Sequence, residues 1–489
     1  MAPRVRFAPS PSGYLHIGSA RTVLFNYLFA RSTGGALVLR IEDTDPSRSK
    51  EELAYQMADT LLWLGIDYDE GPRKGGPYGP YFQSQRTERH RAAAERLLAE
   101  GKAYRCYCTP EELAERREAA VLAGRAPRYD GRCRTLTAEE ARALEAAGRR
   151  PAVRLRVPEE GVTVVHDAIY GDVEFDNAAL DDFIILRSDG MATYNFASVV
   201  DDIDMRITHV IRAEEHLSNT PKQIHVYRAL GVDPPVFAHV PMVLAPDRSK
   251  LSKRHGAVAV EEFREKGYLP EAIVNYVALL GWSPGDDREI FTMDELIREF
   301  SLERVSRTAA VYDVQKMEWI NAQHLRRLPP AEVARRALPW LRKAGLAAEG
   351  AQVDQRLTAA VALVLERVRT LAEIPAAIEF FFRAPETYDE AGVRKHFAAE
   401  GAAERLAACR RIAEEVPSWT AEAIEAAYRA EAERLGVRPA ELIHPTRLAV
   451  TGRTVGPSLF HLLELVPRDE AVRRLERAEA FVRAHAARA

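Results

Sequence analysis

The beginning of the chain alternates between short apolar runs and turn-forming residues. Residues 4–7 read R-V-R-F, with apolar and arginine side chains in the alternation of a strand. From about residue 19 to residue 32 apolar side chains recur at helical spacing, and two glycines at 34–35 end the pattern. The continuous run A-L-V-L-R-I over residues 36–41 is typical of a buried parallel strand. The pattern therefore predicts a β-α-β unit of an α/β fold.

The pattern changes twice further along the chain. Residues 86–199 interrupt the α/β pattern with an arginine-rich stretch. From about residue 326 alanine, glutamate, arginine and leucine predominate at helical spacing, which predicts an almost entirely α-helical final third.

Composition restricts the class of protein. A chain of 489 residues favours two to four domains, and 47% apolar with 29% charged residues is ordinary for a folded protein. No apolar run approaches the roughly 18 residues of a membrane span, and the first residues lack the apolar core of a secretory signal. We therefore expect a cytoplasmic protein. A formal charge of −4 means that any nucleic-acid binding depends on local basic surface.

The turn after the first predicted strand carries candidate chemistry. It reads P-S-P-S-G-Y-L-H-I-G-S, so His16 and Gly18 come at the start of the predicted helix, where free amides and the helix dipole favour a phosphate. The usual fingerprints of dinucleotide and P-loop sites, G-x-G-x-x-G and G-x-x-x-x-G-K-[ST], do not occur at this turn. Alone, His16 is better explained as a loop histidine that caps the helix.

A second motif, K-L-S-K-R at residues 250–254, changes that balance. Lys250 and Lys253 flank Ser252 in a loop that follows an apolar, strand-like segment. A solvated basic turn is the ordinary explanation of such a run. Together with His16, the two lysines indicate a site that holds a nucleoside triphosphate and transfers its α-phosphoryl group, as in adenylate-forming enzymes.

With these two motifs the chain closely resembles the glutamyl-tRNA synthetases, a class I aminoacyl-tRNA synthetase family with the signatures H-I-G-H and K-M-S-K-S. The resemblance extends essentially from end to end and includes L-R-I-E-D-T-D, W-L-G-I-D-Y-D-E-G-P and T-Y-N-F-A-S-V-V-D-D. Ser19 replaces the last histidine of the first signature, and Leu251 and Arg254 replace the methionine and the final serine of the second.

The resemblance implies a division of the chain into four parts. A Rossmann-like class I catalytic domain would comprise residues 1–85 and 200–240, with an inserted α+β domain at 86–199 that grips the tRNA acceptor end. Residues 241–325 would form the lysine loop and a connecting domain. An all-α anticodon-binding region would occupy residues 326–489.

The resemblance also implies a reaction, its cofactors and its partners. L-Glutamate would be activated by ATP with Mg²⁺ and transferred from glutamyl-adenylate to the terminal adenosine of tRNA(Glu), by a monomeric enzyme. His16, Gly18, Lys250 and Lys253 would be the catalytic residues, with His16 and both lysines facing the triphosphate.

The glutamate pocket implied by the resemblance needs cationic groups for carboxylates and an anion for the ammonium. Arg212 would bind the side-chain carboxylate, Arg6 also a substrate carboxylate, and Glu42 the ammonium. Further implied pocket residues are Ser10, Tyr194 and Ser198. Read alone, Arg6 is also explained as an outward strand residue, Glu42 as part of an acidic turn, and Arg212 with Glu214 and Glu215 as a surface ion cluster.

Three cysteines resemble the zinc site of some family members. Cys106, Cys108 and Cys133 provide three of the four ligands that a structural zinc site requires. Thr135 stands where zinc-bearing relatives have histidine, and Tyr129 is a poor substitute. The sequence therefore favours free, partly buried thiols over bound Zn²⁺.

Three other functions are alternatives to a ligase specific for tRNA(Glu). A non-discriminating or paralogous enzyme would glutamylate tRNA(Gln), which active-site motifs do not distinguish. A non-catalytic tRNA-binding paralogue would have no use for the complete set of site residues. A small-molecule adenylyltransferase would have no use for the long helical region.

Overall fold

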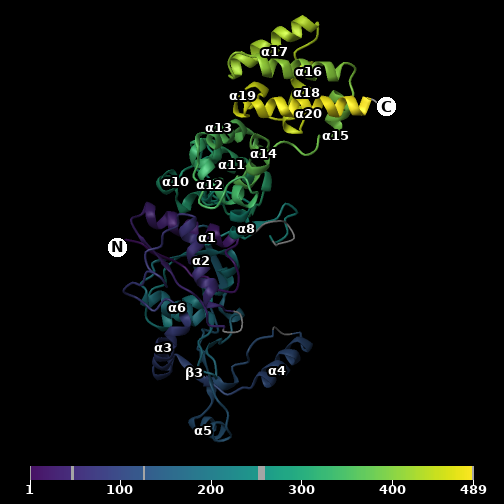
Figure 1. Ribbon diagram of the computed structural model, residues 1–489. Helices are drawn as coiled ribbons and strands as arrows, with labels where there is room; N and C mark the ends of the chain where they lie inside the picture. Colours follow the sequence, from purple (N-terminus) through teal and green to yellow (C-terminus); the bar gives the residue numbers. More distant parts are fainter. Residues whose placement is uncertain (1, 46–48, 125–126, 252–258, 487–489) are drawn as a thin grey trace. The chain divides into compact units, whose positions relative to one another are not determined.

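The computed structural model describes residues 2–45, 49–124, 127–251 and 259–486 (Figure 1). The chain forms two compact units, one of residues 1–263 with 270–316 and the other of residues 264–269 with 317–489. The three boundaries fall within α8 (Val260–Glu265), just before α9 (Pro270–Ala278) and within α11 (Val314–Arg327). The finer division into four parts stays a prediction.

The first unit begins with the predicted β-α-β unit. β1 (Arg4–Phe7) and β2 (Ala36–Leu39) are parallel, and α1 (Ile17–Ser32) connects them. Both strands and nearly every turn of α1 are buried, which explains the continuous apolar runs. The predicted second strand is shorter than expected, because beyond Leu39 the chain leaves β1 and pairs at Ile41 with Phe82.

A second sheet continues from the edge of β1. Its strands are β6 (Gly171–Asp176), β5 (Val162–Asp167), β9 (Val236–Val240) and β8 (His209–Ala213), in that order. Thr208, just before β8, bonds to Arg4 through its amide at 2.9 Å and accepts from the Arg4 amide at 2.8 Å. β8, β9 and β5 are parallel neighbours, so residues at their carboxyl ends lie near one another.

Helices and a smaller sheet pack together with these strands in one hydrophobic core. The core combines α3 (Thr87–Ala99), α6 (Tyr194–Asp204) and α7 (Thr220–Ala229) with the three-stranded antiparallel sheet of β3 (Ala103–Cys106), β4 (Ala152–Leu155) and β7 (Ile184–Leu186). The remaining elements of this unit are α2 (Glu51–Trp63), α9 (Pro270–Ala278), α10 (Met293–Glu299), β10 (Val243–Leu244) and β11 (Ala310–Val311).

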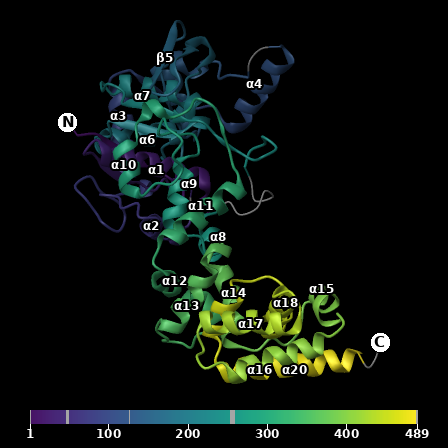
Figure 2. The same cartoon turned by 90° about the horizontal axis from the view of Figure 1, so that it is seen from above.

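Two helices of the arginine-rich stretch lie apart from this core. α4 (Pro110–Leu122) and α5 (Ala138–Ala146) both begin with capping boxes, at Thr109 and Thr137. Neither helix buries a residue, and Figures 1 and 2 show α4 away from the neighbouring helices. Their stability must come largely from caps and local ion pairs.

The described part of the second unit contains helices and no strand, as the composition predicted. Arg474 is buried and donates from Nη1 to the carbonyls of Phe380 and Val450, at 2.6 and 2.9 Å, which ties α20 to two other segments. Its helices are α12 (Pro330–Lys343), α13 (Gln355–Val364), α14 (Ile374–Phe382), α15 (Glu390–Gly392), α16 (Ala402–Glu415), α17 (Ala421–Leu435), α18 (Ala440–Thr451), α19 (Leu459–Leu465) and α20 (Arg468–Ala486).

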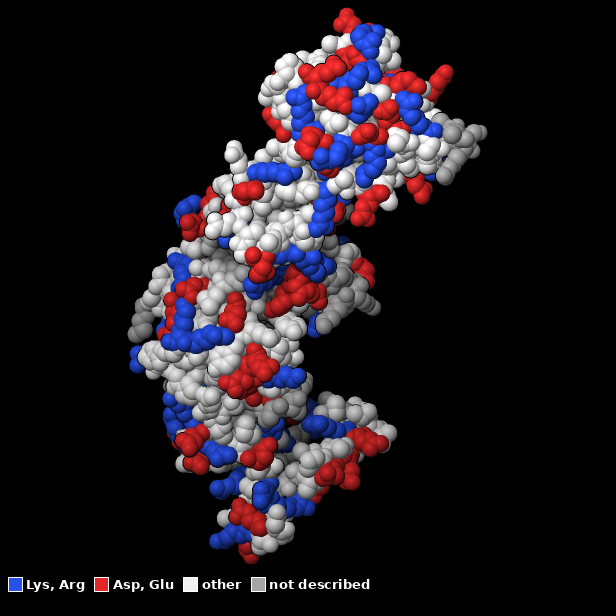
Figure 3. Space-filling view, viewed as in Figure 1, with Lys and Arg blue, Asp and Glu red and all other residues white. Residues whose placement is uncertain are grey.

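Charged side chains of both signs are interspersed over the helices of the second unit. Figure 3 shows basic and acidic groups side by side on its visible face, and many are pairs one helical turn apart, such as Arg429 with Glu425 at 2.5 Å. Such exposed pairs contribute little stability each. Among the helices that the structure describes, none is long and apolar enough to cross a membrane.

A buried ion cluster of the first unit centres on Asp201 of α6. Its Oδ1 accepts from Arg86 Nε at 2.5 Å and lies 2.9 Å from His90 Nε2, while Oδ2 accepts from Gln83 Nε2 at 2.8 Å. Burial by itself raises the pKa of Asp201, but the hydrogen bond from His90 and the charges of Arg40 and Arg86 hold that pKa below its ordinary value. The cluster's contribution to stability is therefore present above the ordinary aspartate pKa and lost as the pH falls through the lowered value.

Replacing Asp201 by asparagine should lower the free energy of unfolding by about 3 kcal/mol, because the buried Arg86 loses its closest anion. Differential scanning calorimetry of the whole chain measures the effect. Asp204→Asn is the matched control, since Asp204 also pairs with Arg86 but is one-third exposed and should cost under about 1 kcal/mol. Equal effects of the two substitutions would contradict this assignment.

Candidate active site

His16 is the N-cap of α1. Its Nδ1 accepts from the Ser19 amide at 3.2 Å, and its Nε2 lies 2.9 Å from Ser19 Oγ. The ring remains open to solvent at the surface, yet crowding by protein atoms lowers the pKa of His16, with Glu215 opposing and Lys250 assisting the shift. The imidazole is therefore neutral at physiological pH, and because Nδ1 accepts from the Ser19 amide, Nε2 carries the proton and donates to the Ser19 hydroxyl.

Gly18 leaves room for the imidazole of His16. A Cβ at this position would lie 3.2 Å from Cε1 and Nδ1 of the His16 ring. A side chain would therefore push the imidazole away from the helix terminus.

Backbone pairing anchors the described residues on either side of the segment 252–258. Lys250 bridges to Leu244 of β10, while Ala259, after the undescribed segment 252–258, bridges to His16. The amide of Val260 donates to the carbonyl of Leu15 at 2.8 Å. Lys253 lies outside the described residues, but the chain on both sides of it is anchored, and on one side it is anchored to the turn that carries His16.

Arg6 lies inside the protein, so its interpretation as an outward strand residue is wrong. It is 4% exposed, and its Nε lies 3.3 Å from Oδ1 of Asp202 on α6. Arg40 Nη1 donates to the same oxygen at 2.6 Å. One aspartate thus pairs with two buried arginines.

Arg40 also joins two predicted pocket residues. Its Nη2 donates to Glu42 Oε1 at 3.1 Å and to the hydroxyl of Ser198 at 3.3 Å. Burial opposes the charge of Arg40, but Asp202 and Glu42 raise its pKa well above the ordinary value. Burial raises the pKa of Glu42 despite Arg40 and Arg6, so an additional cation beside this carboxylate would be stabilising.

Sequence reasoning missed Arg40 and Asp202. The available signals were an arginine within the otherwise apolar run A-L-V-L-R-I and two adjacent aspartates in the amphipathic segment S-V-V-D-D. A charged residue at a position that the pattern assigns to the core must have a buried partner.

Arg212 on β8 differs from the other two arginines, because no carboxylate of the described residues pairs with it. It is 5% exposed, Nε lies 3.1 Å from His239 Nε2, and Nη2 donates to Thr220 Oγ1 at 2.8 Å. Nη1 is buried and has no hydrogen-bond partner among the residues that the structure describes. Burial lowers the pKa of Arg212 from its ordinary value, the expected effect of an uncompensated cation.

The predicted surface cluster of Arg212 with two glutamates is therefore wrong. Glu214 bonds instead to the hydroxyl of Tyr170 and to the amide of Met242. Glu215 lies 3.5 Å from Lys250 Nζ in an exposed pair.

Tyr194 on α6 connects the two sides of the site. Its hydroxyl lies 3.2 Å from Nδ1 of His216, whose carbonyl faces Arg212 Nη2 at 3.5 Å. Burial raises the pKa of Tyr194, and the charges of Arg212, Glu42 and Arg6 all act on it, so these groups share one cluster. Ser10 lies exposed in the turn after β1.

The three predicted cysteines do come together. Their sulfur atoms lie within 4.8 Å of one another, with Cys108 and Cys133 at 3.6 Å. The Tyr129 hydroxyl lies 3.6 Å from Cys106 Sγ and accepts from the Cys133 amide at 2.9 Å. The three sulfur atoms provide three of the four donors of a structural zinc site, and the phenol oxygen beside them is not one of the usual zinc ligands.

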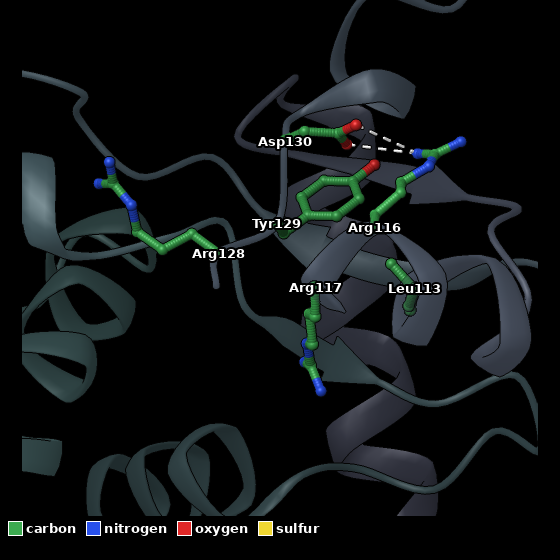
Figure 4. A pocket seen from close by; sticks show the side chains of 6 residues that line it. All are labelled: Leu113, Arg116, Arg117, Arg128, Tyr129 and Asp130. Atoms are coloured by element: carbon green, nitrogen blue, oxygen red, sulfur yellow. Dashed lines mark hydrogen bonds and ion pairs between the residues drawn. The ribbon is translucent and has the colours of Figure 1, made fainter. Parts of the chain in front are cut away.

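A small basic pocket adjoins this cluster. Figure 4 shows Arg116 bonded to Asp130, while Arg117 and Arg128 extend away from the ring of Tyr129. The enclosed space is about 10 Å³, about the size of one water molecule, so the pocket has no room for an organic ligand.

Comparisons with known proteins agree over the whole chain. A family profile described as tRNA synthetases class I (E and Q), catalytic domain, matches residues 3–319, and an anticodon-binding-domain profile matches residues 332–479. The glutamate–tRNA ligase of Moorella thermoacetica is 56% identical over 98% of both chains, and that of Desulforudis audaxviator is 55% identical over 99% of this chain and 97% of the relative.

A solved structure of similar fold supports the same assignment. The crystal structure of a glutamate tRNA ligase from Elizabethkingia meningosepticum, in complex with its amino acid, aligns with a TM-score of 0.92 at 34% identity. The alignment covers 98% of this chain and 99% of that one. The chain therefore belongs to the class I tRNA synthetases of the glutamate and glutamine group, with a catalytic domain followed by an anticodon-binding domain.

Proposed function

We propose that the protein is a glutamate–tRNA ligase, which activates L-glutamate with ATP and transfers it to the 3′-terminal adenosine of tRNA(Glu). The relatives' names support this activity. The observation that carries the substrate assignment is Arg212, a buried guanidinium with a free Nη1 and no carboxylate partner among the described residues. The side-chain carboxylate of glutamate supplies the missing anion and a planar pair of acceptors.

The other charges of the site suit the rest of the amino acid. Glu42 receives the ammonium, and Arg6, already oriented by Asp202, faces the α-carboxylate. Tyr194 and Ser198 line the space between these groups, and Ser10 contributes from the turn after β1. These charged groups of the protein are already fixed in place when the substrate binds, so they require no rearrangement during the reaction.

In the first step an oxygen of the α-carboxylate attacks the α-phosphorus of ATP, and the bond to the bridging oxygen of pyrophosphate breaks. His16 faces the phosphates at the amino terminus of α1, and Lys250 and Lys253 neutralise the charge that develops on pyrophosphate. Mg²⁺ bound with ATP would neutralise further phosphate charge. In the second step the ribose hydroxyl of the terminal adenosine attacks the acyl carbon, and AMP leaves.

We also propose that the enzyme is monomeric, acts in the cytoplasm and charges tRNA(Glu). Anticodon readout determines whether tRNA(Gln) is also a substrate, so the two tRNAs provide the decisive comparison. Transcripts of both are incubated separately with labelled glutamate, ATP and Mg²⁺.

We expect labelled glutamate to be attached to tRNA(Glu) alone. Charging of both tRNAs would mean a non-discriminating enzyme that supports an indirect glutamine pathway. Charging of neither, by protein that binds tRNA, would refute the ligase and favour a non-catalytic tRNA-binding paralogue.

Replacing Arg212 by glutamine should raise the KM for glutamate about a hundredfold and leave the KM for ATP nearly unchanged, because the substrate carboxylate loses a buried cation. Initial rates of tRNA charging at varied glutamate and varied ATP separate the two constants. Arg228→Gln is the matched control, since Arg228 is exposed on the adjacent helix α7. An unchanged KM for glutamate in Arg212→Gln would remove Arg212 from the amino-acid site.

We also propose that Cys106, Cys108 and Cys133 hold one Zn²⁺, because the three sulfur atoms lie within 4.8 Å of one another. The metal would brace the junction of β3 with the segment around residue 133, outside the catalytic site.

Elemental analysis of the purified protein should find about one zinc per chain, lost in Cys133→Ser and kept in Cys409→Ser. Cys409 is the control because it is buried in α16, far along the chain from the three other cysteines. Absence of zinc, with three thiols titrating in the native protein, would instead establish the free thiols that the sequence favoured.

A further inference from the structure

Arg212 is the first member of a hydrogen-bonded chain that crosses three neighbouring strands. Arg212 of β8 lies opposite His239 of β9 in the parallel register. Asp167, the last residue of β5, pairs with the same strand at Phe237. Asp167 Oδ2 lies 2.6 Å from His239 Nδ1, and both side chains are completely buried.

The donors and acceptors of this chain have only one consistent assignment at the histidine. An arginine Nε–H only donates, so His239 Nε2, 3.1 Å away, must accept and carries no proton. His239 Nδ1 then carries the proton and donates a hydrogen bond to Asp167, so the ring is neutral. Asp167 keeps its own position by accepting from the amides of Ile169 and Tyr170, both at 2.9 Å.

The remaining contacts fix the plane of the guanidinium. Thr220 Oγ1 accepts from Arg212 Nη2 at 2.8 Å, and the Phe237 ring lies 5.6 Å from the guanidinium carbon. Phe237 also stacks on His239, with an angle of 16° between the rings. Nε and Nη2 are thus occupied, and Nη1 is the nitrogen left for a ligand.

We propose that Asp167 and His239 are positioning residues that set the specificity for a substrate carboxylate, by orienting Arg212 without neutralising it. This inference rests on the proposed function, in which Arg212 binds the side-chain carboxylate of glutamate. A carboxylate in direct contact with Arg212 would satisfy its charge and reduce its need for an anionic substrate. The neutral imidazole of His239 bonds to both Asp167 and Arg212, so Asp167 orients Arg212 through the ring. The negative charge of Asp167 stays one ring away from the guanidinium.

The same arrangement disfavours glutamine. A neutral amide bound at Nη1 would leave the guanidinium as a buried cation without any anion in contact, which is costly. Arg6, by contrast, contacts Asp202 directly, so its charge is already compensated in the free protein.

Two amide substitutions of His239 separate orientation of Arg212 from simple filling of space. In His239→Gln the amide oxygen reaches the position of Nε2 and accepts from Arg212. In His239→Asn the amide ends near the position of Nδ1, so it bonds to Asp167 but does not reach Arg212. Initial rates of tRNA charging, at varied glutamate and varied ATP, are measured for both variants.

We expect His239→Asn to raise the KM for glutamate about tenfold or more and His239→Gln to raise it much less, with the KM for ATP unchanged in both. Glutamine should inhibit tRNA charging with glutamate more strongly in His239→Asn than in the unsubstituted protein. His225→Asn is the matched control, a buried histidine of α7 that bonds to Thr163 instead, and it should leave the KM for glutamate unchanged. Equal KM values for glutamate in the two His239 variants would overturn the proposal.

Asp167→Asn provides an independent test. An asparagine amide facing His239 would reverse the tautomer, so that an Nε2–H faces the N–H groups of Arg212 and the KM for glutamate rises. In His239→Gln there is no tautomer to reverse, so adding Asp167→Asn should raise this KM little further. Full additivity of the two substitutions would contradict a role through His239.

The outcomes distinguish the inference from the proposed function. If Arg212→Gln impairs glutamate use and the His239 variants do not differ, the function stands and only the positioning role fails. If Arg212→Gln leaves the KM for glutamate unchanged, the substrate assignment fails with it.

Discussion

The site depends on one electrostatic constraint, that a buried guanidinium requires an anion. Three arginines, Arg6, Arg40 and Arg212, are each at most 5% exposed, and Asp202 serves the first two of them. No described carboxylate contacts the third. Of these three arginines, Arg212 is therefore the one whose charge is not compensated by a contacting carboxylate, and a substrate carboxylate is the simplest group that would bind its Nη1.

The parallel strands make this arrangement geometrically possible. β8, β9 and β5 lie side by side, so Arg212, His239 and Asp167 meet although 72 residues separate the histidine from the aspartate. Hydrogen bonds in a buried network also fix side-chain positions that a solvated loop would leave variable. Rigid strands thus hold the proposed amino-acid pocket, while His16 and Lys250, the described residues proposed to face the phosphates, lie in a turn after β1 and in the segment after β10.

Much of the fold and many of the site residues could be predicted from local patterns. The β-α-β start follows from apolar spacing, and the helical final part follows from composition and periodicity. His16 and Lys250 could be proposed from the sequence because the amides, imidazole and cations that phosphate chemistry would need stand close together in short motifs. Arg40 and Asp202 were missed because the two residues lie 162 positions apart in the sequence, and no local pattern connects them.

By itself the sequence determined the elements, the family and the types of residue that the chemistry requires, since each is encoded in short segments with a fixed period or spacing. Only the tertiary structure decided which arginine is compensated and which is not. Arg6 and Arg212 are chemically identical side chains at similar burial, and long-range strand and helix packing gives one an aspartate and the other a neutral histidine. That difference arises from the neighbours each residue meets in space, because electrostatic energy depends on distance in the folded chain and not on position along it.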